Sequence, residues 1–301
     1  MSANLKLNVP VAGEPYRIVK VLGAGAAGEV YLVENHRAQR LEALKILKKV
    51  EQSEADLVAQ GRFKREVRAA QLLSHQNIVA TYDCGQLADG RPFLTMEYVE
   101  GVSLHSLLQQ RGPLPIPMVI GIIAEIADAL YHAHLAGVVH RDIKPHNLVL
   151  ANHPDGQIVR VLDFGMAKIL GGHETMVLSA DGAIFGTPKY MSPEQCRGLP
   201  PDPRTDIYAL GCVAFELLLG EAPFKGALAP MFMHHMKTPP RVPSQVDPEA
   251  GIPPELDALI LRCLEKAPEK RFQSGADLCA AAQSVPGYRP LRSPKNWGAH
   301  A

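Results

Sequence analysis

The apolar residues of this 301-residue chain change their spacing once along its length, and that change constrains the fold more than any other feature. Up to about residue 97, short runs of β-branched and apolar residues are separated by glycine or polar turns, which is typical of strands. After Ser103 the long apolar runs have helical spacing, as in 116–136, 206–219 and 254–264. We therefore predict an α+β chain in which a small strand-rich lobe precedes a larger helical lobe.

The limits of the lobes follow from the same pattern. One helix, 59–74, is expected to interrupt the strands of the small lobe, because its apolar residues fall on one face. Strands are expected at 16–23, 29–35, 41–50, 78–87 and 92–99. The predicted parts are an N-terminal extension over 1–15, a folded domain over 16–285 with its small lobe at 16–97 and its large lobe at 101–285, and a tail or linker over 286–301.

Composition argues against several classes of protein. The chain has 31 basic and 31 acidic residues, whereas a dedicated nucleic-acid binder carries a strong basic excess. Its five cysteines are scattered and form no C-x-x-C pair, which argues against a disulfide framework or zinc ribbon and favours a reducing, cytoplasmic compartment. The longest apolar stretch, 207–220, contains Glu216 and is too short to cross a bilayer, so we expect no membrane span. The oligomeric state stays open.

A glycine-rich segment separates the first two predicted strands. Residues 22–30 read LGAGAAGEV, a G-x-G-x-x-G-x-V pattern formed by Gly23, Gly25 and Gly28. Glycine lets the backbone approach a phosphate closely and offers N–H donors to it. A dinucleotide fingerprint needs a helix after the motif, whereas the residues that follow here read as a strand. The segment is therefore a hairpin lid over a nucleotide or an ordinary glycine-rich hairpin.

Lys45 lies in an otherwise apolar strand, ALKIL, so an ammonium that points inward needs an anionic partner. Glu66, in the helical stretch that follows, is a candidate for that partner. A lysine held in this way is well placed to bind the α and β phosphates of a nucleotide. The alternative is a surface lysine and a solvated glutamate, and these two residues alone do not decide between the readings.

Two short polar segments, HRDIKPHN and DFG, indicate the chemistry of the chain. Asp142 and Asn147 lie in the first segment, and Asp163 follows Asn147 by 16 residues, after an apolar run. Mg²⁺ prefers hard oxygen ligands, which Asn147 and Asp163 supply. Asp142 is then left to orient an attacking hydroxyl, and Lys144 to neutralise charge on a transferring phosphoryl group.

With these motifs in order, the sequence resembles the protein kinase family, specifically the bacterial eukaryotic-like (Hanks-type) Ser/Thr kinases. The resemblance covers about 16–282 and also rests on MEYVEG, GTPKYMSPE and DIYALG. It implies a bilobal protein-kinase fold, ATP as phosphoryl donor, Mg²⁺ or Mn²⁺ as metal, and Asp142 as the acceptor of the substrate's hydroxyl proton. Proteins with Ser or Thr acceptors are the implied partners, since Lys144 and Thr187 match the Ser/Thr form.

The resemblance also implies roles for residues outside these segments. Glu194 is expected to pair with Arg271, Asp206 to hold the backbone of the loop around Asp142, and Thr187 to lie near Asp142 and Lys144. Met96 is expected to limit the pocket behind the adenine, and Ser103 to lie near the ribose. The remaining implied ATP contacts are Leu22, Val30, Ala43, Glu97, Val99 and Val149, together with the three glycines and Lys45.

Arg141, next to Asp142, lacks an obvious anionic partner in the local sequence. We expect a phosphate on the segment 163–194 to supply one and to switch activity, with Ser179 favoured over Thr175 as the acceptor. Small-molecule phosphotransferases of similar fold match the motifs less well. A pseudokinase, which binds nucleotide without transferring phosphate, is the alternative, although such scaffolds typically lose the equivalents of Lys45, Asp142 or Asp163.

Overall fold

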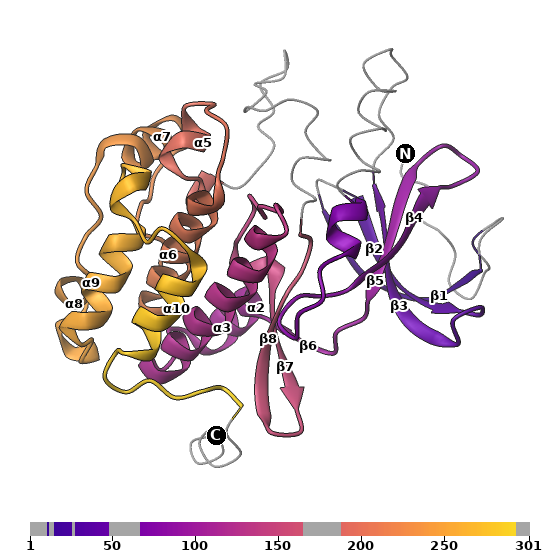
Figure 1. Cartoon of the computed structure of the whole chain (residues 1–301), viewed down its shortest axis with the longest axis horizontal. Helices are drawn as coiled ribbons and strands as arrows, with labels where there is room; N and C mark the ends of the chain where they lie inside the picture. The colour runs from indigo at the N-terminus through magenta and orange to yellow at the C-terminus, as the bar shows by residue number, and fades with distance from the viewer. Residues whose placement is uncertain (1–10, 12–14, 26–27, 48–66, 165–187, 293–301) are drawn as a thin grey trace. The chain divides into compact units, whose positions relative to one another are not determined.

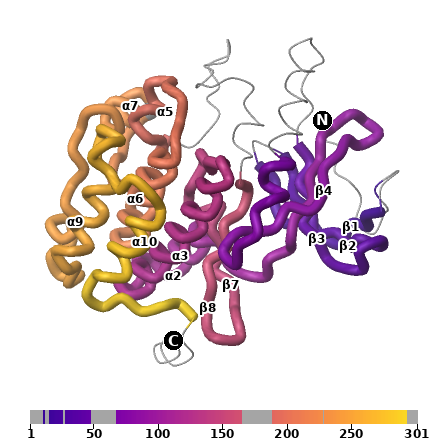
Figure 2. The backbone as a smooth tube through the Cα atoms, viewed as in Figure 1, coloured from indigo at the N-terminus to yellow at the C-terminus, as the bar shows by residue number. Residues whose placement is uncertain are grey.

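The computed structural model describes residues 11, 15–25, 28–47, 67–164 and 188–292. The chain divides into two compact units: unit 1 comprises Met1–Ser74 and Val79–Val99, and unit 2 comprises His75–Ile78 and Glu100–Ala301. The division after Val99 falls between the predicted small lobe, which ends at 97, and the predicted large lobe, which begins at 101. Residues His75–Ile78, which the sequence analysis assigned to the small lobe, belong to unit 2. Figure 1 and Figure 2 trace the chain through both units.

Unit 1 contains a five-stranded antiparallel sheet in the order β1-β2-β3-β5-β4 (Figure 1). The five predicted strands are confirmed, with ends that differ by a few residues. Residues 67–71 are helical and form the described part of the helix expected at 59–74. The strands are β1 Tyr16–Gly25, β2 Gly28–Asn35, β3 Arg40–Leu47, β4 Thr81–Gln86 and β5 Pro92–Glu97.

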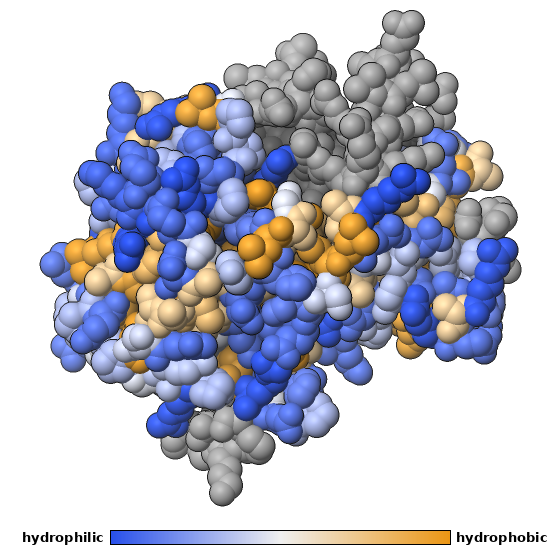
Figure 3. Space-filling model, viewed as in Figure 1, coloured by the Kyte–Doolittle hydropathy of each residue, from blue (hydrophilic) through white to orange (hydrophobic). Residues whose placement is uncertain are grey.

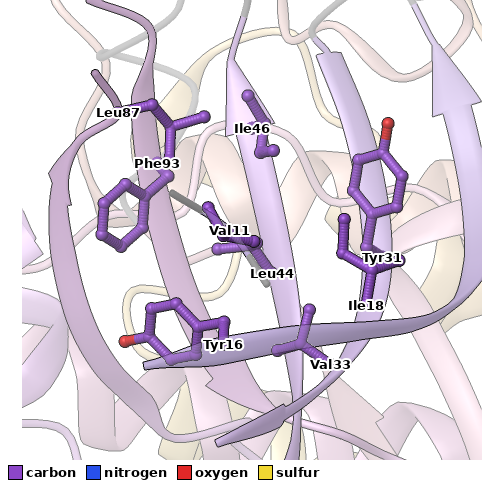
Figure 4. Packing of buried hydrophobic residues seen from close by; sticks show 9 residues of the cluster. All are labelled: Val11, Tyr16, Ile18, Tyr31, Val33, Leu44, Ile46, Leu87 and Phe93. Carbon is purple, nitrogen blue, oxygen red and sulfur yellow. The ribbon is translucent and has the colours of Figure 1, made fainter. Parts of the chain in front are cut away.

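One face of this sheet carries an apolar cluster, drawn in Figure 4. Tyr16 and Phe93 meet edge to face, with ring centroids 5.9 Å apart, a favoured geometry for two aromatic rings. Val11, which we predicted to lie in an extension, belongs to this cluster, and its N–H donates to the carbonyl of Tyr16 at 2.8 Å. The packed domain therefore begins earlier than the sequence pattern indicated.

Unit 2 is mainly helical, as predicted, and includes a small three-stranded sheet in the order β6-β7-β8. Its strands are β6 Gly101–Ser103, β7 Leu148–His153 and β8 Gly156–Val161. Its helices are α2 Leu104–Arg111, α3 Ile116–Leu135, α5 Pro193–Cys196, α6 Pro203–Leu219, α7 Leu228–Lys237, α8 Pro243–Val246, α9 Pro254–Cys263 and α10 Gly275–Gln283, with 3-10 turns η1 Pro145–Asn147, η2 Pro188–Tyr190, η3 Pro248–Ala250 and η4 Pro268–Lys270.

Helices α3 and α6 form the core of unit 2. Almost every residue of α6 is buried, which explains why its sequence is apolar on all sides. Among the described residues, α3 alone has the length and hydropathy of a membrane span, but 67% of that window is buried inside the protein. Such burial is typical of the core helix of a globular domain. Hydrophilic side chains cover much of the face seen in Figure 3.

The segment after α10 packs against unit 2. Leu291 is fully buried, and its carbonyl accepts a hydrogen bond from the N–H of Gln157 at 3.1 Å. Gly121 of α3 makes room for it, since a Cβ there would lie 3.0 Å from the Leu291 side chain. The structure therefore places 286–292 with the folded domain, and a tail can include only the residues that follow.

Gly28 begins β2, opposite the end of β3, and its conformation requires glycine. Its φ is 151°, and a Cβ at this position would lie 2.0 Å from the carbonyl oxygen of Ile46. Neither Gly23 nor Gly25 has an atom within 4 Å of the place of a Cβ. The three glycines of the motif therefore differ, since only Gly28 is required by the packing of the sheet itself.

We predict that Gly28→Ala lowers the free energy of unfolding by about 1–3 kcal/mol, the usual cost of overpacking and backbone strain. Gly23→Ala is the matched control and is expected to change it by less than about 1 kcal/mol, the usual effect of Gly→Ala at an unstrained site. Urea unfolding followed by circular dichroism measures both. Equal stability of the two variants would contradict the assignment of Gly28.

Candidate active site

The loop between α3 and β7 is anchored by Asp206, in the first turn of α6. Asp206 is completely buried. Its Oδ2 accepts hydrogen bonds from the N–H of His140 at 2.8 Å, and its Oδ1 from the N–H of Arg141 at 2.7 Å. Arg141 has a φ of 69°, a left-handed conformation that costs energy outside glycine, and these bonds stabilise it. The structure thus gives Asp206 the position that the resemblance implied.

His134 of α3 lies against the same carboxylate, and the sequence analysis missed it. Its Nε2 lies 2.8 Å from Asp206 Oδ2. One helical residue, a two-residue turn and two further residues separate His134 from the HRD segment, and no local pattern marks it. The contact joins α3 to α6 beneath the loop.

Asp142, Lys144 and Asn147 converge at the centre of the loop. Lys144 Nζ donates to Asp142 Oδ2 at 2.7 Å. Asn147 Nδ2 donates to the Asp142 carbonyl at 2.8 Å and to Asp142 Oδ2 at 3.1 Å. The Asp142 side chain remains 38% exposed, so it is accessible to a ligand. The structure therefore brings together three of the residues predicted to carry out the chemistry.

Asn147 is oriented so that its amide oxygen suits a metal ion. Both groups that it contacts around Asp142 are hydrogen-bond acceptors, so the amide nitrogen must face them. Its Oδ1 is then the atom directed elsewhere, and a neutral oxygen is a ligand that Mg²⁺ accepts. Asp163 has a φ of 62°, so its backbone, like that of Arg141, has a left-handed conformation that costs energy outside glycine. An amide oxygen and a carboxylate form a donor set that fits a hard divalent cation.

His140 links the two polar segments and was not among the predicted site residues. It is fully buried, and its Nδ1 accepts the N–H of Asp142 at 3.2 Å. The proton must therefore be on Nε2, which lies 2.7 Å from the carbonyl of Leu162. Its ring also meets the edge of Phe164, with centroids 4.8 Å apart. The N–H of Leu162 donates to the Asn147 carbonyl at 2.9 Å, so the approach to Asp163 is tied to the loop.

Glu194 and Arg271 form the ion pair that the resemblance implied. Arg271 is completely buried, and its two terminal nitrogens each donate to one carboxylate oxygen at 2.8 Å. The Thr205 hydroxyl donates to Glu194 Oε1 at 2.9 Å. Burial by itself raises the pKa of Glu194, but the hydrogen bonds and charge of Arg271 outweigh it and hold the pKa below its usual value. The pair is bidentate and desolvated, the strong form of such an interaction.

Two further contacts fix the segment 188–196 to unit 2. The Tyr190 hydroxyl donates to Glu216 Oε2 at 2.5 Å, and Glu216 is buried in α6. Gln195 Nε2 donates to the carbonyl of Arg141 at 3.0 Å. Gln195 also completes a capping box with Ser192 at the start of α5. The spacing of Ser192 and Gln195 in the sequence matches a capping box. The contact of Gln195 with the carbonyl of Arg141 depends on the fold.

The residues expected to bind the nucleotide are divided between the two units. In unit 1, Lys45 is 8% exposed on β3, opposite Val30 of β2 and Leu94 of β5. Ala43 pairs with Met96, and Leu22, in the last part of β1, is 39% exposed.

The other expected contacts are Glu97 and Val99 in unit 1, and Val149 and Ser103 in unit 2. Glu97 ends β5, and its N–H donates to the Ala80 carbonyl at 2.9 Å; Val99 is half-buried. In unit 2, Val149 is buried on β7. The Ser103 hydroxyl, expected near the ribose, caps α2 by accepting the N–H of Ser106 at 3.1 Å. Glu66, Thr175, Ser179 and Thr187 lie outside the described residues.

Comparisons with known proteins agree with this arrangement. Residues 16–283 match the family described as "Protein kinase domain". The serine/threonine-protein kinase pkn3 of Myxococcus xanthus is 39% identical over 275 residues, which cover 90% of this chain and 50% of that protein. The serine/threonine-protein kinase PknB of Mycobacterium leprae is 37% identical over 294 residues, covering 95% and 45%. The chain thus spans about half the length of these curated relatives.

Solved structures show the same architecture. The PknI kinase domain of Mycobacterium tuberculosis has a TM-score of 0.70 to this chain at 30% sequence identity. The match covers 93% of this chain and 98% of that one. Both the strand-rich and the helical parts therefore have counterparts in a known structure.

We predict that Glu194→Gln lowers the free energy of unfolding by about 3–5 kcal/mol, because it leaves the buried guanidinium of Arg271 without its counter-ion. Arg17→Ala, which breaks an exposed pair with Glu34, is the control and is expected to change the free energy of unfolding far less, because solvent screens exposed charges. Urea unfolding at neutral pH measures both changes. Comparable losses of stability in the two variants would refute the prediction that the buried pair matters more than the exposed pair.

The pH dependence gives the same pair a second signature. Because the pKa of Glu194 is lowered from 4.5 on folding, the carboxylate adds stability above that value, and this stability is lost as the pH falls through the folded pKa. The Glu194→Gln protein should therefore lose less stability than the unmodified chain below pH 4.5.

Proposed function

The chain belongs to the protein kinase family, and we propose that it transfers the γ-phosphoryl group of ATP to serine and threonine hydroxyls of proteins. The observation that carries this proposal is the convergence of Lys144 and Asn147 on the half-exposed carboxylate of Asp142. The names of the relatives support Ser/Thr acceptors. The proposal concerns this chain, which covers about half of those proteins.

The proposed chemistry assigns one task to each residue. Asp142 accepts the proton of the substrate hydroxyl and orients its oxygen, while Lys144, bonded to the same carboxylate, stabilises negative charge on the transferred group. Asp163 and the Oδ1 of Asn147 would hold Mg²⁺, which neutralises phosphate charge when bound. Lys45 would bind phosphate oxygens, supported by Glu66. Positioning and charge stabilisation are the main sources of catalysis in phosphoryl transfer.

A nucleotide-binding scaffold without transfer activity is the alternative. Its expected signature is loss of the lysine, the loop aspartate or the second aspartate, and the chain keeps Lys45, Asp142 and Asp163. The loop around Asp142 also keeps its internal hydrogen bonds. These observations favour the enzyme.

We predict that Asp142→Asn reduces the transfer rate by about 10²–10⁴-fold, the usual contribution of a positioned general base. Lys45→Met and Asp163→Asn are expected to cause losses at least as large, with the thermal unfolding temperature of all three little changed. Incorporation of labelled phosphate from ATP with Mg²⁺ into a generic protein acceptor measures the rates, and Glu249→Gln, at an exposed position, is the control. Equal incorporation by the Asp142→Asn protein would favour the scaffold.

Substrate selection should not depend on arginine. A carboxylate is the strongest side-chain partner for a substrate guanidinium, and the Glu216 carboxylate already accepts the Tyr190 hydroxyl and is buried. His146, four residues after Asp142, stacks on His105 of α2 with ring centroids 3.7 Å apart. Lys144 and Lys189 add positive charge near His146.

We therefore predict that a peptide library shows no dominant arginine selection upstream of the acceptor. His146→Glu introduces a carboxylate beside the loop and is expected to increase arginine selection. Strong selection of arginine at two or more upstream positions by the unmodified chain would contradict this prediction.

Phosphorylation of the segment 163–194 is the proposed switch. Arg141 supports it, because its Nε is buried and has no hydrogen-bond partner within the described part of the chain. A phosphate is a strong acceptor for a guanidinium and is able to order a loop around it.

We predict that Ser179→Ala, combined with Thr175→Ala, abolishes phosphate incorporation between residues 171 and 186 and lowers activity. Mass spectrometry after incubation with ATP and Mg²⁺ locates the modification, and Ser179→Ala alone tests the preferred site. A fully active double variant, together with an unphosphorylated segment in the unmodified chain, would refute the switch and leave the kinase assignment intact.

A further inference from the structure

A buried histidine of α7 has no part in the chemistry described above. His235 is completely buried, whereas the neighbouring His234 is half-buried. The Nδ1 of His235 lies 2.9 Å from the hydroxyl of Tyr208 in α6, and its ring meets the edge of Phe224 with centroids 4.9 Å apart. Helix α7 packs against α5, which Figure 1 shows beside it, and against the turn η2. His235 therefore lies in the core between α6 and α7.

The contacts of Tyr208 determine where the proton of this imidazole lies. Lys266 Nζ donates to the Tyr208 hydroxyl oxygen at 3.4 Å, so the hydroxyl hydrogen is free to point to His235. Burial raises the pKa of Tyr208, and the hydroxyl therefore keeps its hydrogen at neutral pH. His235 is neutral as well, because burial and the charge of Lys266 lower its pKa to about 3. A neutral imidazole that accepts at Nδ1 carries its proton on Nε2.

The Nε2–H of His235 is a buried donor, and the groups beside it are backbone carbonyls. Nε2 is shielded from solvent and makes no hydrogen bond within the part of the chain that the structure describes. The carbonyls of Pro188 and Lys189, in η2, are the acceptors that lie beside the ring. A buried donor without an acceptor destabilises a protein, so a shift of η2 that completes this bond is favourable.

The turn η2 borders the loop around Asp142. Lys189 is exposed, and its charge acts on His146. His146 directly precedes Asn147, whose amide contacts Asp142 Oδ2 at 3.1 Å. An extended peptide spans only about 3.3 Å per residue. We therefore expect an acceptor whose hydroxyl meets Asp142 to place its neighbouring residues against η2.

We propose that His235 is a positioning residue for the acceptor protein. Its Nε2–H closes onto a carbonyl of η2 when an acceptor binds against that turn, and Tyr208 and Lys266 behind the ring keep the proton on Nε2. The completed bond holds the turn, and with it the acceptor, beside Asp142. His235 is completely buried and does not touch the acceptor itself. The inference rests on the proposed function, since it concerns the acceptor of phosphoryl transfer.

Two variants separate the N–H of His235 from the volume of its ring. His235→Phe keeps an aromatic ring without the donor, and we expect it to raise the KM for the acceptor peptide selected from the library about 3–10-fold, as for the loss of one hydrogen bond. His235→Gln keeps an N–H near the place of Nε2 and should bring this KM back to within about 2-fold of the unmodified chain. The kcat and the KM for ATP should change by less than about 2-fold, because the lost interaction serves acceptor binding alone.

The same substitution at the neighbouring residue is the matched control. The His234 ring lies 3.0 Å from the Thr238 hydroxyl, and His234→Phe should leave the KM for the peptide unchanged. An unchanged KM in His235→Phe, or an equal rise in His235→Phe and His235→Gln, would overturn the proposal, since a residue that only fills space gives one of these two results.

A double-mutant cycle tests the contact behind the ring. Tyr208→Phe removes the hydroxyl that fixes the proton on Nε2, so we expect it to raise the same KM, by less than His235→Phe does. Combined with His235→Phe it should cause no further rise, because Tyr208 acts through His235. Additive effects of the two substitutions on KM would refute this arrangement.

Nitrogen NMR of the imidazole tests the inference on the unmodified chain. The ¹⁵N chemical shifts of a histidine ring distinguish which nitrogen carries the proton. We expect a neutral His235 with its proton on Nε2, and we expect the acceptor peptide to shift this signal. A proton on Nδ1, or an Nε2 signal that the peptide leaves unchanged, would overturn the role of His235 and leave the proposed function intact. Absence of phosphoryl transfer by the unmodified chain would overturn the proposed function and this role together.

Discussion

The carboxylate of Asp206 is the interaction on which the rest of the site depends. A buried charge is costly unless its lone pairs are satisfied, and Asp206 is completely buried. It meets this requirement with the backbone N–H groups of His140 and Arg141 and with the ring of His134. The same bonds hold Arg141 in a left-handed conformation, which sets the direction of the chain into Asp142. A helix in the core thus determines the position of a surface carboxylate.

The same reasoning applies to other buried charges of unit 2. Glu194, Glu216 and Arg271 are buried, and each has a partner at hydrogen-bond distance. Such pairs add little net stability compared with apolar packing, but breaking one leaves an uncompensated charge. They therefore select one arrangement of the segment 188–196 against α6. Gln195, in the same segment, donates a hydrogen bond to the carbonyl of Arg141 and so connects the segment to the loop around Asp142.

In unit 1 the backbone, more than charge, determines the geometry. Gly28 lies so close to the Ile46 carbonyl that a side chain has no room, and this contact joins the glycine-rich segment to the strand of Lys45. Apolar neighbours on both sides of Lys45 keep it buried on β3. The sheet thus holds on neighbouring strands the two features that the sequence predicts to bind phosphate.

The sequence by itself determined the order of strands and helices, the family, and the polar residues of the loop around Asp142, because these depend on local periodicity and on short motifs. The tertiary structure alone decided which distant groups meet them. His134 lies 72 residues from Asp206, and Val11 and Leu291 are buried at opposite ends of the chain, where no local pattern marks a core residue. Only the folded chain shows that Asn77 Oδ1 accepts no hydrogen bond from the described residues, since the partners of a polar atom depend on its neighbours in space. Short-range spacing records which face of an element is buried; the folded chain alone determines what it is buried against.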